Sequence, residues 1–105
     1  MATKKSSVIK KSSTYKIVRT DRAGVFAGEV VRRRGREVEM INVRRLWYWA
    51  GAATLSQLAQ EGTRKPLDCK FPQQVDRIVL LDVIEIIDVT EMARVSLQEV
   101  PAWRA

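Results

Sequence analysis

The stretch that most constrains the fold of this chain runs from Val75 to Thr90. It is rich in valine, isoleucine and leucine, and most of these side chains are β-branched. Branching at Cβ restricts side chains in a helix and suits the pleated surface of a sheet, so we expect strands here. The apolar alternation shifts by one residue near Val83 and Ile84. This shift predicts either one strand that bends or two short strands that meet at a break.

Two segments near the N-terminus predict further strands. Residues 15–20 alternate between two faces and contain mainly residues that favour strands. Residues 25–32 form a second such run, which Gly28 interrupts. Because a glycine inside a strand often marks a sharp bend or a close backbone approach, we expect the second strand to bend.

A hairpin is predicted to follow the second strand. Residues 33–36 read Arg-Arg-Gly-Arg, and the glycine adopts a positive φ more readily than an arginine. The returning strand should occupy residues 38–49. Its apolar residues change face between Met40 and Asn42, which predicts a bulge or bend at that point.

One helix has a clear start and stop. Thr54 and Gln57 have the spacing of a capping box, and Gly62 follows the apolar positions as a C-terminal stop. Residues 92–97 predict a further short helical turn before Pro101. The chain should therefore have a mainly β fold of the α+β class, with one or two short helices and a small, strongly bent antiparallel sheet.

The length and the charge distribution predict one domain behind a basic arm. With 105 residues the chain has room for one core. Residues 1–14, rich in serine and lysine, predict a flexible basic arm, residues 15–97 the single β-rich domain, and residues 98–105 a C-terminal tail. Five of the 19 basic residues and no acid fall within residues 1–16, so 14 basic and 12 acidic groups leave the rest with a charge of +2.

The sequence also predicts a soluble protein of a reducing compartment. Its single cysteine, Cys69, excludes an intrachain disulfide. No run is apolar enough for a secretory signal or long enough to span a bilayer. We therefore expect no membrane contact.

Catalysis is not expected. The chain has no histidine, and neither a nucleophile elbow nor a phosphate-binding glycine loop is present. The closely spaced acids are Asp82, Glu85 and Asp88, and on a strand the first and last share a face while Glu85 points away. Solubility of a strand face explains them more simply than Mg²⁺-dependent chemistry by Asp82 or Asp88. We predict no catalytic residue, no cofactor and no bound metal.

A ligand site is predicted at the segment Arg-Arg-Leu-Trp-Tyr-Trp. Guanidinium groups pair with phosphates, and aromatic rings stack on bases. The predicted ligand residues for a nucleotide or nucleic acid are Arg44, Arg45, Trp47, Tyr48 and Trp49. The alternative left open is that these rings fill the core or a subunit interface, where tryptophan, tyrosine and arginine are also enriched.

Two basic elements predict contacts with phosphates. One is the loop with Arg32, Arg33, Arg34 and Arg36, and the other is the arm with Lys4, Lys5, Lys10 and Lys11. Binding through such groups weakens steeply with salt and gives little sequence specificity. For the loop, the alternative is charge that is simply solvated.

Three segments resemble a family of small proteins from tailed bacteriophage genomes. They are residues 24–29 (GVFAGE), residues 44–59 with the motifs RRLWYW, GAA and LSQLA, and residues 82–87 (DVIEII). The resemblance spans roughly residues 15–93 and implies a phage origin without an established activity. The bent second strand with its glycine gives a looser likeness to SH3-like and Sm-like small barrels.

Together these features predict a phage-encoded, non-enzymatic binding protein that acts as a homo-oligomer in the cytoplasm of the infected bacterial host. Its expected ligand is a nucleotide or a nucleic acid, and a use in a phage would be to counter host defence. The alternative is a structural or protein-interaction module, either a virion accessory protein or an inhibitor that docks on a host protein.

Overall fold

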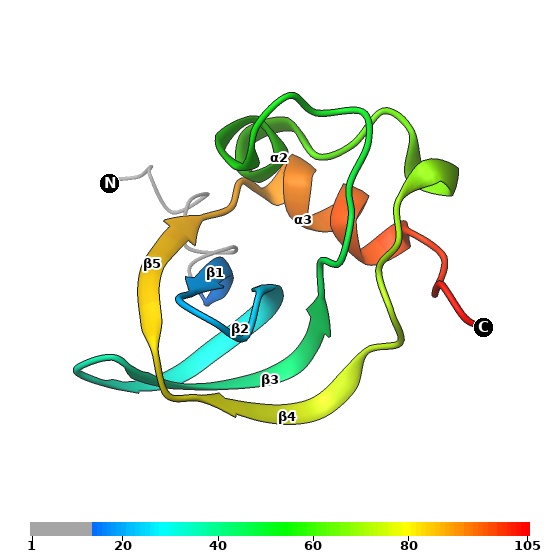
Figure 1. Cartoon of the computed structure of the whole chain (residues 1–105). Coiled ribbons are helices and arrows are strands. Elements are labelled where there is room, and N and C mark those ends of the chain that lie inside the picture. The colour runs from blue at the N-terminus through cyan, green and yellow to red at the C-terminus, as the bar shows by residue number, and fades with distance from the viewer. Residues whose placement is uncertain (1–13) are drawn as a thin grey trace, which may run out of the picture.

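The computed structural model describes residues 14–105 (Figure 1). Within them, five antiparallel strands form one sheet in the order β4-β3-β2-β1-β5. The fold is mainly β and of the α+β class, as predicted. The strands are β1 (Tyr15–Thr20), β2 (Val25–Arg34), β3 (Glu37–Arg45), β4 (Val75–Leu80) and β5 (Val83–Asp88), and the helices are α2 (Leu55–Glu61), the short 3-10 helix η1 (Pro66–Asp68) and α3 (Glu91–Glu99). The predicted arm lies outside the described residues except for Thr14, so Lys4, Lys5, Lys10 and Lys11 are not placed.

The sheet bends so strongly that its two edge strands approach each other. β4 and β5 lie at opposite ends of the strand order, yet only Leu81 and Asp82 separate them along the chain. Figure 1 shows the strands curling around a common centre. The amide of Val83 donates to the carbonyl of Arg36 over 3.0 Å, which links β5 to the β2–β3 turn. The predicted break near Val83 thus separates two short strands, while the likeness to SH3-like and Sm-like barrels stays a prediction.

The bend is built where β2 and β3 come closest. A Cβ on Gly28 would lie only 2.7 Å from the Cα of Val43, so the backbones can approach only because this residue is glycine. The pairing register between β2 and β3 shifts at this glycine, between Ala27 and Glu29. Asn42 has a φ of 48° and its side-chain amide donates to Glu29 over 3.2 Å. The bulge predicted near residues 40–42 is therefore present in β3.

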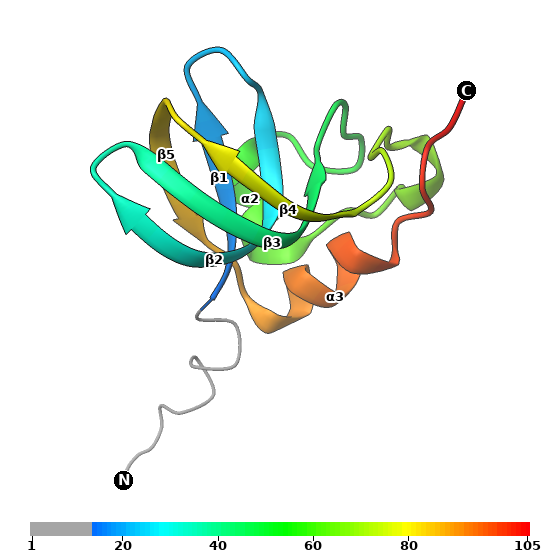
Figure 2. The same cartoon turned by 90° about the horizontal axis from the view of Figure 1, so that it is seen from below.

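Both faces of the sheet are buried, because each packs against its own apolar cluster. The first cluster draws on all five strands, including both edges, and so fills the inside of the bend; it comprises Val18, Phe26, Val38, Met40, Val43, Leu80 and Val83. The second cluster joins the opposite face to the helices and includes Ile17, Ala27, Leu46, Leu58, Phe71, Ala93 and Leu97. Figures 1 and 2 show α2 and α3 lying together beside the sheet. Neighbouring strand residues such as Ile17 and Val18 therefore enter different cores.

The C-terminal part of the chain is packed against this framework. Thr90 caps α3, since its hydroxyl accepts a hydrogen bond from the amide of Ala93 over 3.1 Å. Beyond the helix, Val100 is buried, and the amide of Trp103 donates to the carbonyl of Phe71 over 2.9 Å. The segment that the sequence presented as a tail thus contributes to the core.

Candidate functional site

Arg44 points into the interior rather than toward a ligand. Its side chain donates to the carbonyls of Phe71 and Val100 over 2.8 Å each, and to those of Pro72 and Leu97 over 3.3 Å. The residue is only 6% exposed, and burial lowers the pKa of its guanidinium, although nearby groups oppose this shift. We therefore correct the prediction for Arg44, because it joins core segments and does not reach the surface where a ligand would bind.

The other predicted ligand residues are divided among three surroundings. Arg45 follows Arg44 on β3 and so points to the opposite face, where its guanidinium carbon lies 4.7 Å from the centroid of the Phe26 ring. Trp49 is half-buried and packs against the second core cluster. Trp47 and Tyr48 are 66% and 51% exposed. The structure therefore does not bring the two guanidinium groups and the three rings together in one pocket.

An exposed aromatic pair instead gathers around a lysine that the sequence reasoning missed. Tyr48 pairs with Lys70 in an isolated antiparallel bridge. The ammonium nitrogen of Lys70 lies 5.7 Å from the centroid of the Tyr48 ring and 5.6 Å from that of Trp103. Trp103 is 45% exposed. We call Tyr48, Lys70 and Trp103 the aromatic–lysine surface; these residues are distant in sequence, so no spacing signal points to them.

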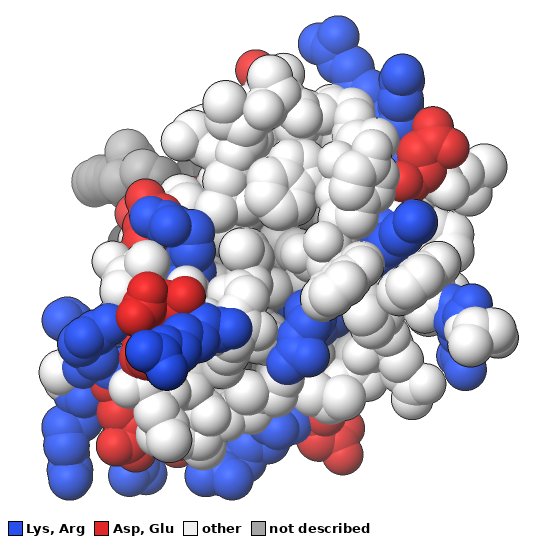
Figure 3. Space-filling view, in the orientation of Figure 1, with Lys and Arg blue, Asp and Glu red and all other residues white. Residues whose placement is uncertain are grey.

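The predicted basic loop is the tip of the β2–β3 hairpin. Arg34 pairs across the hairpin with Glu37, and Gly35 occupies the turn with a φ of 60°. Arg33 donates to the carbonyl of Gly35 over 2.9 Å, and Arg36 donates to that of Val83 over 3.3 Å. Figure 3 shows Lys and Arg side chains gathered at the end of the molecule where Figure 1 places this hairpin. The arginines of the loop are therefore grouped on one end of the fold.

Acids neutralise only part of this charge. Glu39 receives a hydrogen bond from Arg77 over 2.8 Å and lies 3.6 Å from Arg32. The hydrogen bond from Arg77 lowers the pKa of Glu39. Arg34 forms no ion pair within residues 14–105. We call Arg32, Arg33, Arg34, Arg36 and Arg77 the arginine end.

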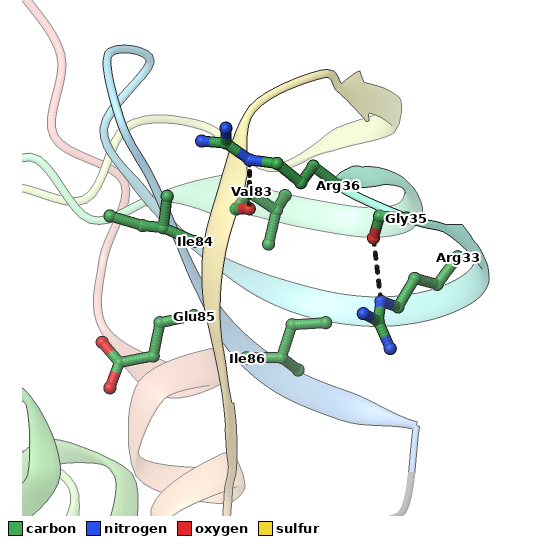
Figure 4. Close-up of a pocket in the computed structure, with 7 residues that line it drawn as sticks. All are labelled: Arg33, Gly35, Arg36, Val83, Ile84, Glu85 and Ile86. Carbon is green, nitrogen blue, oxygen red and sulfur yellow. Dashed lines mark hydrogen bonds between the residues drawn. The ribbon is translucent and has the colours of Figure 1, made fainter.

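A hollow of about 630 Å³ lies between this hairpin and β5. Figure 4 shows Arg33 and Arg36 reaching from the hairpin, with Ile84, Glu85 and Ile86 on the strand opposite. The hollow thus has a cationic wall on the side of the hairpin and a largely apolar wall on the side of β5. Glu85 is bound by Arg19 over 2.8 Å, so it does not neutralise the arginines of the hollow.

The three acids considered for catalysis each have a structural partner. Asp88 pairs with Lys16 over 2.6 Å and Glu85 with Arg19 over 2.8 Å, while Asp82 accepts a hydrogen bond from the amide of Arg22 over 3.0 Å. Within the described part of the chain, no three cysteine or acidic side chains are placed to hold a metal ion. Cys69 is buried. The contacts of the three acids therefore join β1 to β5, and the turn after β1 to the turn before β5.

A second hollow, of about 390 Å³, lies between α3 and η1. Its apolar lining includes Leu67 and Met92, which are 83% and 62% exposed, together with Val95.

No helix that the structure describes is long and apolar enough to cross a membrane.

Comparison with known proteins gives one match. Residues 13–97 match a family model described as a domain of unknown function, DUF6948. No curated protein matches the chain, and no solved structure does. The predicted phage origin and the predicted homo-oligomer stay predictions.

Proposed function

The chain belongs to the family DUF6948, a domain of unknown function, and we propose that it is a non-enzymatic protein that binds nucleic acid through the arginine end. The observation that carries this proposal is the grouping of arginines on and beside the β2–β3 hairpin, of which Arg33, Arg34 and Arg36 form no ion pair within the described residues.

The charge of this end favours a polyanion. Five arginines stand against Glu37 and Glu39, which leaves a net charge of +3 on these residues. Guanidinium groups bind phosphate oxygens with two parallel hydrogen bonds, and they stay charged at every physiological pH. A two-stranded ribbon holds the groups close together, so one stretch of phosphate backbone can contact several of them.

Such binding should depend strongly on salt. Each phosphate that a basic side chain neutralises releases condensed counterions, and each contact adds about 0.7 to 0.9 to the slope of log K against log salt. Because the contacts are to phosphate, we expect little preference for base sequence at the arginine end.

The test is fluorescence anisotropy of labelled DNA oligonucleotides with the full chain at several salt concentrations. The double variant Arg32→Gln with Arg34→Gln removes two charges from the arginine end. The matched control, Arg64→Gln with Lys65→Gln, removes two charges from the exposed loop after α2. We expect the first variant to weaken binding and reduce the salt slope by more than 1, and the control to change both much less. Equal effects of the two variants would refute a specific role for the hairpin.

A protein-interaction module is the second candidate, favoured by the apolar hollow between α3 and η1. Large apolar side chains exposed side by side are typical of docking surfaces. The substitution Met92→Glu should abolish self-association or partner binding without altering the affinity for DNA. Sedimentation of the wild-type chain at increasing concentration tests the predicted homo-oligomer, since a monomer at all concentrations contradicts it.

A further inference from the structure

The backbone around Lys70 places three extended segments side by side. Tyr48 and Lys70 form an antiparallel bridge, with the amide of Lys70 donating to the carbonyl of Tyr48 over 2.8 Å. On the other side, Phe71 and Ala102 form a parallel bridge, and the amide of Trp103 donates to the carbonyl of Phe71. Lys70 is therefore flanked by Tyr48 on one side and Trp103 on the other.

This small ribbon is held from beneath by Arg44. Phe71, the neighbour of Lys70, is fully buried. The Arg44 guanidinium binds the carbonyls of Phe71 and Val100 over 2.8 Å each. The segments that carry Lys70 and Trp103 are thus tied to the same buried cation, which fixes their spacing before any ligand arrives.

The groups above this support remain accessible. Tyr48 and Trp103 are about half exposed, and Lys70 is exposed. Lys70 forms no ion pair within the described residues, and its ammonium lies within 6 Å of both ring centroids. The surface therefore offers two aromatic rings and one uncompensated cation to the same ligand.

That combination fits an unpaired nucleotide. Every base has a π-face that stacks on tyrosine or tryptophan, and a flexible lysine can pair with the phosphate next to it. In a duplex the base faces are already stacked on one another, so the rings gain nothing from it. A cationic ligand is disfavoured because Lys70 already supplies a cation to both rings.

We propose that the aromatic–lysine surface is a stacking site for unpaired bases, so that the protein prefers single-stranded nucleic acid. This inference rests on the proposed function, because the arginine end supplies the phosphate contacts that any strand shares. Figure 1 places the hairpin and the C-terminal segment on opposite sides of the molecule. Variants at one surface should therefore leave the other intact.

The experiment compares a labelled oligothymidine strand with a duplex of similar length, using the full chain at low salt. Tyr48→Leu and Trp103→Leu remove one ring each, while Tyr48→Phe and Trp103→Phe retain a ring as matched controls. Lys70→Gln removes the cation. We expect each leucine variant to lose about tenfold in single-strand affinity, the phenylalanine variants to lose little, and duplex affinity to stay unchanged.

A second readout does not depend on affinity alone. Stacking on Trp103 should quench part of the tryptophan emission when oligothymidine is added, and Trp103→Leu should remove that part while Trp47 and Trp49 keep theirs. Thermal unfolding of every variant shows whether its fold is retained.

The outcomes separate this inference from the proposed function. If the leucine variants bind oligothymidine as the wild type does, the stacking site is refuted while the arginine end still stands. If the wild type binds neither strand nor duplex, the proposed function fails and this inference with it. If the leucine variants instead lose only self-association, the aromatic–lysine surface is a protein interface and the inference is overturned.

Discussion

Replacing Arg44 by methionine should destabilise the fold more than any other single change of a charged residue that we consider. Methionine keeps most of the aliphatic volume, so the substitution mainly removes hydrogen bonds and leaves no large cavity. Two of the lost bonds, to Phe71 and Val100, measure 2.8 Å, and the bond to Leu97 measures 3.3 Å. The carbonyl of Val100 lies at the C-cap of α3, where backbone acceptors lack partners within the helix, whereas the carbonyl of Leu97 also accepts the amide of Val100.

The magnitude follows from these contacts. A hydrogen bond that involves a charged group contributes about 1.5 to 3 kcal/mol, so the two short bonds together represent about 3 to 6 kcal/mol. A domain of this size has a total stability of about 5 to 15 kcal/mol. Arg44→Met should therefore remove a large share of the free energy of unfolding and lower the Tm by at least about 10 °C.

Urea unfolding, followed by tryptophan fluorescence and circular dichroism, measures this loss. Arg45→Met is the matched control, because it removes the same side chain from the next position on β3, where Arg45 is exposed and its guanidinium contacts the ring of the buried Phe26. The control should lose no more than about 1 kcal/mol. If Arg44→Met loses as little as its control, the reasoning that Arg44 joins the core segments is refuted.

Three further predictions concern stability. Burial raises the pKa of Tyr15 to about 12, whereas a tyrosine ordinarily titrates at about 10. The wild type should therefore lose stability as the pH rises from about 10 through 12. Tyr15→Phe should lessen that loss in alkaline urea titrations, and identical curves for the two proteins would contradict the prediction. Gly28→Ala should destabilise by about 1 to 3 kcal/mol, since its Cβ would stand 2.7 Å from the backbone of Val43, and an unchanged midpoint in urea would show that β2 and β3 can move apart. Thr90→Ala should lose about 1 to 2 kcal/mol in the same assay, because its hydroxyl both caps α3 at Ala93 and donates to a carbonyl of α2, whereas Thr90→Ser should retain most of it.

The strands could be located from local sequence because each carries its own run of residues that favour strands, although β3 ends at Arg45 and not at the expected residue 49. Gly28 and the apolar shift near Met40 indicated the bend and the bulge before any pairing was known. The capping residue Thr54 and the stop at Gly62 likewise placed α2, whose N-cap and C-cap they are. The full length of α3 was missed, because its apolar residues pack against α2 and the sheet, a relation that local spacing does not contain.

The candidate site was harder to predict, because its decisive contacts join distant residues. Nothing in the sequence around Arg44 shows that carbonyls of residues 71, 97 and 100 will surround it. Adjacent residues on a strand face opposite sides, so one arginine of the pair had to be turned away from the other. Lys70 and Trp103 were missed for the same reason, since only the pairing of three separate segments brings them to Tyr48.

The buried arginine and the exposed rings are parts of one arrangement. Because Arg44 binds the carbonyl of Phe71, it holds the residue that follows Lys70, and because it binds Val100, it holds the chain that leads to Trp103. Tyr48 is paired directly with Lys70, so loosening either contact should let the ring of Trp103 drift relative to the lysine. Arg44→Met, studied well below its unfolding midpoint, should then weaken single-strand binding more than duplex binding. If it does so, a residue that touches no ligand sets the geometry of the proposed stacking site.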